Sequence, residues 1–305
     1  MTTLLLLGST GQVGHELRQT LAPLGTLVAP DRVRLDLTDP DSIQSVILQV
    51  KPAVIVNAAG FTVVDAAQAQ PDLAMQVNGI APGIIAEAAK RIGALLLHYS
   101  TTFVFDGTKR TPYTEDDKPN PINVYGRSKR AGEQAIQACG GDHIIIRANW
   151  TYSSRRTNFA LKMLELARVN TEIKVVDDQI GAPTWARAYA NATAEMLNNQ
   201  RRLREHSGLY NLSAEGQCTR YEWAERIVES AKTLMGERDG WARLARTTTE
   251  NFTLPAPRPL YTRTNNSKIR KLLGIELKPW DESMCDFMQD HLQRRFAETG
   301  AYGNG

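Results

Sequence analysis

The chain has 305 residues, of which 42% are hydrophobic and 23% are charged, and its formal net charge is +3. This composition is typical of a globular protein with a sizeable core, arranged as one large domain or two smaller ones. The net charge is too small to indicate a nucleic-acid partner, whereas a small anionic ligand fits it equally well.

The cysteines and the apolar runs exclude two further classes of protein. Cys139, Cys218 and Cys285 are scattered without a CxxC spacing, which indicates reduced thiols rather than a disulfide frame or a zinc site. The leucine run at 4–7 is too short for a signal peptide or a membrane span. We therefore expect a cytoplasmic protein with no membrane and no nucleic acid as partners.

Short apolar runs alternate with helical patterns in the first half of the chain. The runs predict five strands, at residues 4–7, 26–29, 53–57, 94–100 and 143–148. Helices are predicted at about 12–22, from a cap at Asp39 or Asp41 to Val50, at 71–92, and from about Tyr125 to Ala138. Strands that are apolar throughout are buried on both faces, as in a parallel sheet covered by helices. The pattern predicts an α/β fold with a Rossmann-like, doubly wound parallel sheet.

The rhythm loosens after about residue 150. Helices are predicted near 158–168, 185–200, 219–235 and 281–297, with short strands at 173–176 and 209–212. We expect this half to form a smaller α/β lobe against the carboxyl edge of the sheet, where ligands bind in open α/β sheets.

Three glycines three residues apart follow the first predicted strand. Gly8, Gly11 and Gly14 lie between this strand and the first helix, where they allow a tight turn and a close approach to a pyrophosphate. Such a triplet also occurs in plain strand–helix turns, but here the strand, turn and helix follow in the required order. The GxxGxxG spacing resembles the short-chain dehydrogenase/reductase class, especially its extended members. The segment predicted to bind the cofactor comprises Gly8, Gly11, Gln12, Val13 and Gly14.

We accordingly expect residues 1–150 to form an NAD(P)-binding Rossmann domain, with parts of 170–200 returning to it. Residues 151–305 are expected to form mainly the substrate-binding lobe.

The residues after the second strand bear on the choice of cofactor. Asp31 suits a ribose 2′-hydroxyl and favours NADH, whereas Arg32 and Arg34 suit a 2′-phosphate and favour NADPH. Because both types are present, either NADPH or NADH is expected as cofactor. The resemblance adds Asp36 and Leu37 at the adenine, and Ala58, Ala59 and Gly60 along the cofactor after the third strand.

A tyrosine and a lysine four residues apart, Tyr125 and Lys129, share one face of a predicted helix. A nearby cation favours the phenolate, so Lys129 is expected to lower the pKa of Tyr125 and make it a general acid toward a ketone oxygen. Lys129 is also expected to reach the nicotinamide ribose. Tyr125 and Lys129 are therefore both predicted to contact the cofactor. YxxxK alone also occurs on helix surfaces without any catalytic role. Here, however, the fourth strand ends in Ser100, Thr101 and Thr102 at the interval that the class shows, and Thr101 aligns with its catalytic serine or threonine.

The whole chain resembles the dTDP-4-dehydrorhamnose reductase family. The matching segments are GSTGQVG (8–14), IVNAAGFTVVDAA (55–67), HYSTTFVFDG (98–107), NVYGRSKRAGE (123–133), RANWTY (147–152), DDQIGAPT (177–184) and, more loosely, PRPLYTRTNNSKI (257–269). The resemblance implies NAD(P)H-dependent reduction of the C4 ketone of dTDP-6-deoxy-L-lyxo-4-hexulose to dTDP-L-rhamnose. It implies Thr101, Tyr125 and Lys129 as the catalytic triad.

The resemblance also implies a set of substrate contacts, at Thr62, Val64, Ser100, Thr102, Phe103, Trp150 and Arg258. Trp150 is expected to pack on the sugar or, alternatively, to belong to the core. Arg258 is expected to meet the pyrophosphate or, alternatively, to be a solvated loop residue. Trp185 has the same two alternatives, a stacking role on the ligand or helix packing.

The sequence departs from the family pattern at several places. Thr102 and Phe103 replace an aspartate and a tyrosine near the sugar. Some members dimerise through a magnesium-linked acidic cluster, of which Glu16 remains while Arg187 and Asn191 stand where further acids are expected. We therefore expect no metal, and a monomer or weak homodimer. Two other functions stay open: another nucleotide-sugar 4-reductase or epimerase of the same class, and a non-catalytic subunit that only binds NADP.

Overall fold

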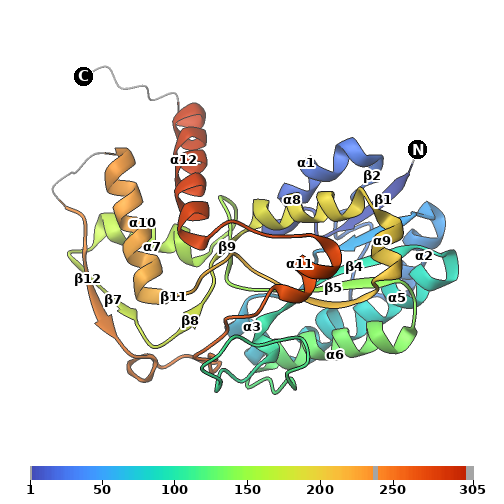
Figure 1. The fold of residues 1–305 in the computed structure, drawn as a ribbon, viewed down its shortest axis with the longest axis horizontal. Helices are drawn as coiled ribbons and strands as arrows, with labels where there is room; N and C mark the ends of the chain where they lie inside the picture. The colour runs from blue at the N-terminus through green and yellow to red at the C-terminus, as the bar shows by residue number, and fades with distance from the viewer. Residues whose placement is uncertain (1, 236–239, 300–305) are drawn as a thin grey trace.

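A computed structural model describes residues 2–235 and 240–299 of the chain. Its central feature is a six-stranded sheet with the order β10-β5-β4-β3-β1-β2, in which all neighbouring strands are parallel (Figure 1). The strands are β1 (Thr3–Leu7), β2 (Thr26–Val28), β3 (Val54–Asn57), β4 (Leu95–Thr101), β5 (His143–Ala148) and β10 (Gly208–Leu212). The Rossmann-like doubly wound sheet predicted from the sequence is confirmed.

Helices cover both faces of the sheet because alternate strand residues point to opposite sides. One face packs against α1 (Gln12–Leu21), α8 (Ala186–Leu197), α9 (Gln200–Glu205) and α11 (Ser267–Leu273). The other face packs against α2 (Pro40–Val50), α5 (Ala81–Ile92) and α6 (Val124–Cys139). In β1, for example, Leu4 and Leu6 lie in the first cluster and Leu5 and Leu7 in the second. A one-residue slip of register would exchange the two sets, so burial on both faces holds the register.

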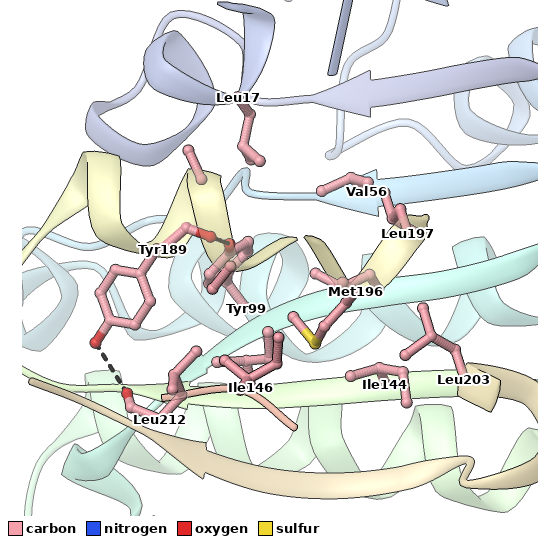
Figure 2. Packing of buried hydrophobic residues seen from close by; sticks show 14 of the residues in the cluster. Leu17, Val56, Tyr99, Ile144, Ile146, Tyr189, Met196, Leu197, Leu203 and Leu212 are labelled. Carbon is pink, nitrogen blue, oxygen red and sulfur yellow. Dashed lines mark hydrogen bonds between the residues drawn. The ribbon is translucent and has the colours of Figure 1, made fainter. Parts of the chain in front are cut away.

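Figure 2 shows the first of these two cores at close range. Leu17 of α1 and Tyr189 and Met196 of α8 lie against side chains of the sheet such as Val56 and Ile146. The hydroxyl of Tyr189 donates to the carbonyl of Leu212 at 3.0 Å, which links α8 to β10. Helix α8 thus belongs to the layer over the sheet although it follows residue 150 in the chain.

The second half of the chain carries a separate core of aromatic and aliphatic residues. It is built by α7 (Phe159–Val169), α10 (Arg220–Met235), α12 (Trp280–Thr299) and β7 (Glu172–Val176). Strand β7 pairs in parallel with β12 (Arg243–Thr247). The short strands β6 (Thr151–Tyr152), β8 (Ile180–Gly181), β9 (Thr184–Trp185) and β11 (Cys218–Thr219) connect this core to the sheet.

The observed elements differ from the sequence-based expectations mainly in the second half. Residues 209–212 were expected within the smaller lobe, but β10 is the edge strand of the main sheet because Leu209 pairs with Ile145 of β5. The helical stretch 71–92 is divided into α4 (Pro71–Met75), a π-helical turn (Gln76–Ile80) and α5. The short helices α3 (Val64–Ala69), α9 and α11 and the polar strand β12 were not predicted, since too few residues carry a periodic signal there.

Within the described ranges, no helix is both long enough and apolar enough to cross a lipid bilayer.

Candidate active site

The glycine turn between β1 and α1 has the geometry that its sequence predicts. Gly8 has φ +78°, and a Cβ on it would lie 2.5 Å from the backbone nitrogen of Ala59. A Cβ on Gly14 would lie 2.0 Å from the carbonyl oxygen of Gly8. Helix α1 begins at Gln12 with Gly11 as N-cap, and no side chain caps its first turn. The free N–H groups and the helix dipole leave this turn suited to an anion.

A loop from the second half of the chain closes onto this turn. Ser153 donates to the side-chain oxygen of Gln12 at 3.1 Å. The guanidinium of Arg156 donates from Nε to the backbone carbonyl of Thr10 at 3.0 Å. These contacts could not be predicted from the sequence, because nothing in a local pattern links residues more than 140 positions apart.

The residues after β2 form an exposed turn. The carboxylate of Asp31 accepts a hydrogen bond from the backbone N–H of Arg34 at 2.9 Å. The side chains of Arg32 and Arg34 are exposed, and Arg32 lies 3.8 Å from the carboxylate of Asp36. Hydrogen bonds from Thr38 lower the pKa of Asp36. Leu37 packs at the edge of the core beneath this turn. The two arginines are thus accessible to a ligand at the end of β2.

The segment after β3 connects the glycine turn to α6. Ala58 and Ala59 lie against Gly8, and a Cβ on Gly60 would lie 4.0 Å from Nζ of Lys129. The side chain of Asn78 holds this segment from behind: it accepts from the backbone N–H of Phe61 at 2.8 Å and donates to the hydroxyl of Ser128 at 3.1 Å. The cofactor-binding residues predicted after β1 and β3 are therefore next to each other and next to the lysine of the triad.

Thr101 ends β4, and its hydroxyl accepts a hydrogen bond from the backbone N–H of Phe103 at 3.2 Å. That bond uses a lone pair of the oxygen, so the hydroxyl proton remains available to another acceptor. Tyr125 lies in the first turn of α6, which Asn123 caps by accepting from the N–H of Gly126 at 2.8 Å. Burial raises the pKa of Tyr125, and the neighbouring Thr101 hydroxyl offsets part of that rise.

The expectation that Lys129 lowers the pKa of Tyr125 is wrong for the chain by itself. The ammonium of Lys129 donates to the carbonyl of Tyr99 at 2.5 Å and lies 3.2 Å from Nε2 of His98. Burial lowers the pKa of Lys129 to about 8, while Glu133 acts in the opposite direction. The phenol is therefore fully protonated at neutral pH, which is the form a proton donor requires.

His98 is a partner of Lys129 that the sequence analysis did not assign. It is fully buried on β4, and burial together with the charge of Lys129 keeps its pKa well below the usual range. A neutral imidazole accepts at Nε2 when its proton is on Nδ1, so the ring serves as an acceptor for the ammonium. In the described part of the chain, Nδ1 has no hydrogen-bond partner.

A buried ion pair lies behind the triad. Glu133, one turn beyond Lys129, accepts from Nε and Nη2 of Arg147, each at 2.8 Å, and from the hydroxyl of Ser100 at 2.6 Å. Burial alone would raise the pKa of Glu133, but these hydrogen bonds and the charge of Arg147 hold it below its usual value. The pair joins β4, β5 and α6. Its only sequence signal was the i,i+4 spacing from Lys129 to Glu133, which is too common to be diagnostic.

Three predicted substrate residues lie beside Thr101, in different surroundings. The hydroxyl of Ser100 is bound to Glu133 and supports the ion pair. Thr102 is buried, and its hydroxyl has no hydrogen-bond partner among the described residues. The half-buried ring of Phe103 meets the ring of Tyr125 edge-on, with centroids 5.8 Å apart. Thr62 is exposed and Val64 is half-buried at the start of α3.

Trp150 follows β5 with a left-handed backbone, φ +30°, which is rare for a bulky residue. Its ring is buried, and Gly181 lies so close that a Cβ there would be 2.5 Å from the indole. The ring stacks on Trp223 of α10, with centroids 5.8 Å apart and planes at 15°. Trp150 is thus part of the second core, at the same carboxyl edge of the sheet as Thr101.

The two other candidates have partners within the protein. Arg258 donates to the carboxylate of Asp65 at 2.8 Å and to the carbonyl of Ala256 at 2.7 Å. Trp185 packs edge-on against Phe287 of α12, which favours the helix-packing alternative.

Arg187, which stands where the resemblance led us to expect an acid, pairs with two carboxylates. Arg187 donates to Glu16 at 2.9 Å and to Asp290 at 2.8 Å, so both carboxylates have a cationic partner. Among the residues that the structure describes, no group of three or more histidine, cysteine, aspartate or glutamate side chains could hold a metal ion.

Comparison with known proteins gives a consistent result. A family model described as the RmlD substrate binding domain matches residues 1–293. A dTDP-4-dehydrorhamnose reductase of Burkholderia thailandensis is 41% identical over 282 residues, which cover 91% of this chain and 95% of that protein. The structure of a dTDP-4-dehydrorhamnose reductase from Clostridium acetobutylicum has a TM-score of 0.88 at 31% identity and covers 96% of this chain and 100% of its own. That of a Bacillus anthracis dTDP-4-dehydrorhamnose reductase in complex with NADP has a TM-score of 0.86 at 30% identity, covering 95% and 100%.

Proposed function

The chain belongs to the dTDP-4-dehydrorhamnose reductase family, and we propose that it reduces the C4 ketone of dTDP-6-deoxy-L-lyxo-4-hexulose to dTDP-L-rhamnose with NADPH or NADH. The observation that carries this proposal is the convergence of Thr101, Tyr125 and Lys129 beside the glycine turn. The segment after β3 forms the link, because Ala59 lies against Gly8 and Gly60 lies next to Lys129.

The residues present fit a dinucleotide. A Cβ on Gly8 or Gly14 would collide with neighbouring backbone, so the two glycines allow the tight turn that leads into α1. The first turn of α1 has N–H groups without a side-chain cap, which suit a pyrophosphate. Asp31 and the exposed Arg32 and Arg34 offer contacts to a ribose hydroxyl or a 2′-phosphate. Asp36, Leu37 and Ala58–Gly60 complete the proposed cradle. The bound cofactor supplies a hydride for C4 of the sugar.

The protein supplies the proton. Tyr125 is protonated at neutral pH and donates its phenolic proton to the ketone oxygen as the C–H bond forms. Thr101 donates a hydrogen bond to the same oxygen with the proton that its contact with Phe103 leaves free. Lys129, whose ammonium lies beside Gly60, is the proposed partner of the nicotinamide ribose.

Thr62, Val64, Thr102, Phe103 and Trp150 are the proposed substrate contacts, with Ser100 acting from behind through Glu133. We further propose a cytoplasmic protein, which suits the free thiols, acting as a monomer or weak homodimer.

Removal of the phenolic hydroxyl tests the proposal. Tyr125→Phe should lower kcat by roughly 10²- to 10⁴-fold with little change in NADPH affinity, because only the proton donor is lost. Absorbance of NADPH with the dTDP-4-keto sugar gives kcat, and fluorescence titration gives the affinity. Tyr152→Phe is the matched control, since this buried phenol has no hydrogen-bond partner in the described part of the chain. Full activity in Tyr125→Phe would refute the acid role.

The same assay separates the rival functions. A reductase consumes one NADPH for each sugar, an epimerase retains its nicotinamide between turnovers, and a regulatory subunit binds NADP without turnover. Catalytic rather than stoichiometric use of cofactor would exclude the reductase.

A further inference from the structure

An arginine of the second core is stacked on aromatic rings. The guanidinium carbon of Arg220 lies 3.7 Å from the centroid of the Trp150 ring. It lies 4.9 Å from the centroid of Phe159 and 5.3 Å from that of Trp223. Three rings from three segments thus surround one side chain, which is half-buried. Such an environment fixes the guanidinium plane and removes much of its hydration.

This cation has no anionic partner. Across residues 2–235 and 240–299, no hydrogen bond or ion pair joins the side chain of Arg220 to any acceptor. Other arginines near the site are bound by carboxylates: Arg147 by Glu133, Arg187 by Glu16 and Asp290, and Arg258 by Asp65. Burial lowers the pKa of Arg220, and the positive charge of Arg258 acts in the same direction. A poorly hydrated cation with no counter-charge favours the binding of an anion.

The surrounding elements place Arg220 at the ligand edge of the sheet. It is the first residue of α10, directly after β11, whose Cys218 pairs with Gly181. Gly181 in turn lies against the indole of Trp150. Trp150 is two residues beyond Ala148, which is in register with Thr101 of the triad. Figure 1 shows α10 together with α7 and α12, away from the six-stranded sheet.

A guanidinium that stacks on a ring keeps its N–H donors in its own plane, parallel to the ring, where they point outward toward other acceptors. This fork matches two oxygens of one phosphate group. Arg258, the residue expected from the sequence to meet the pyrophosphate, already has its donors bound to Asp65 and Ala256.

We propose that Arg220, held flat by Trp150, binds the diphosphate of the nucleotide-sugar substrate and is the main charge that recognises it. The inference rests on the proposed function for the identity of the ligand, a thymidine diphosphate ester. In this proposal α10 recognises the diphosphate, and the residues around Thr101 and Tyr125 bind the sugar.

Binding of product-like nucleotides, without turnover, tests this assignment. Calorimetric titration of the NADP-loaded protein should give a dissociation constant for dTDP that rises about 10- to 100-fold in Arg220→Met, since a charged hydrogen-bonded contact is lost. Thymidine, which has no phosphate, should bind both proteins equally. Met preserves apolar contact with the rings, so the loss should be specific to the phosphate.

Two further variants serve as matched controls. Arg246 also stacks on a ring, that of Tyr221 at 4.1 Å, but it is paired with Asp177. Arg246→Met should leave dTDP affinity unchanged. Arg258→Met should reduce it less than Arg220→Met does.

Equal dTDP affinity in wild type and Arg220→Met overturns the proposal, as does a larger loss in Arg258→Met or a wild-type protein that does not bind dTDP. If Arg220→Met does not fold, Arg220→Lys replaces it: weaker binding of dTDP but not of thymidine supports the proposal, and equal binding overturns it. The proposed reductase activity is tested independently of the diphosphate site. If the keto sugar is not turned over but dTDP binding depends on Arg220, the diphosphate site stands without the reaction.

Discussion

On the side of the site built by β4, β5 and α6, buried charged side chains have hydrogen-bond partners within the protein. On the side built by the loop after β5 and by α10, the side chain of Arg220 has no hydrogen-bond or ion-pair partner among the described residues. Glu133 is bound by Arg147 and Ser100, and Lys129 by Tyr99 and His98. Arg220 lies instead against the aromatic rings of Trp150, Phe159 and Trp223. The first side is complete before any ligand binds, and the second becomes complete only with an anion.

This difference suits two different tasks. The proton transfer proposed for Thr101 and Tyr125 needs both side chains at fixed positions, and the ion pair between α6 and β5 holds their elements together. Capture of a charged substrate needs binding energy that appears only when the ligand arrives. A stacked, unpaired guanidinium supplies it without rearrangement of the protein.

The largest expected effect is on stability, when one arginine on each side of the site is replaced by methionine. Arg147→Met leaves the carboxylate of Glu133 buried with fewer donors and should lower the free energy of unfolding by about 3–5 kcal/mol. Arg220→Met leaves no buried anion unpaired and should cost less than about 2 kcal/mol, the upper range of a cation–π contact. Urea unfolding at one pH, with both variants made in the wild-type background, measures the difference.

The unfolding free energies of these two variants decide whether the two arginines differ in their role. If Arg220→Met destabilises the protein as much as Arg147→Met does, then Arg220 is a structural residue of the second core and its open charge is incidental.

The pH dependence of NADPH affinity tests whether the charge of Lys129 contributes to cofactor binding. The partners that hold the ammonium of Lys129 are neutral, and burial lowers its pKa to about 8. Below that pH the lysine is charged and attracts the anionic cofactor; above it the charge is lost, so the affinity should fall as pH rises. We expect the dissociation constant of NADPH to rise by up to about tenfold per pH unit above 8.

The control for this profile is Lys129→Arg, because a guanidinium keeps its proton throughout the range. Its NADPH affinity should lack the decline above pH 8. A flat wild-type profile from pH 7 to 10 would contradict the role given to the lysine charge.

The smallest effect is expected from metal removal. Arg187 already neutralises Glu16 and Asp290, so EDTA should leave the mass of the protein in solution and its NADPH affinity unchanged. Light scattering with and without magnesium measures the mass. A dimer that forms only with magnesium would show that the arginine does not replace the cation.

Local sequence patterns predicted the sheet side of the molecule well. The strand predicted at 143–148 is β5 with the same limits. Of the two caps considered for α2, Asp39 and Asp41, Asp39 is the one that accepts from the N–H groups of Asp41 and Ser42. Period-2 burial, helix caps and glycine turns depend on neighbours within a few residues. The sequence therefore contained enough information for the glycine turn and for the order of Thr101, Tyr125 and Lys129.

The partners of charged side chains could not be predicted in the same way. Arg258, Arg147 and Arg220 look alike in a sequence, but Asp65 binds the first, Glu133 the second and no acceptor among the described residues the third. Arg258 and Asp65 are 193 residues apart, and Arg147 and Glu133 are 14 apart. Arg220 and Trp150, which stack on each other, also come from separate segments of the chain.

By itself, then, the amino-acid order determined the alternation of strands and helices, the turn at Gly8 and the arrival of a phenol, an ammonium and a hydroxyl at one sheet edge. Only the tertiary structure decided that His98 and Tyr99 hold the lysine, that Glu133 holds Arg147, and that Arg220 keeps its charge open to a ligand. The reason is physical: backbone geometry and periodicity are local, whereas the partner of a charge depends on which distant segments the packing of two cores brings together.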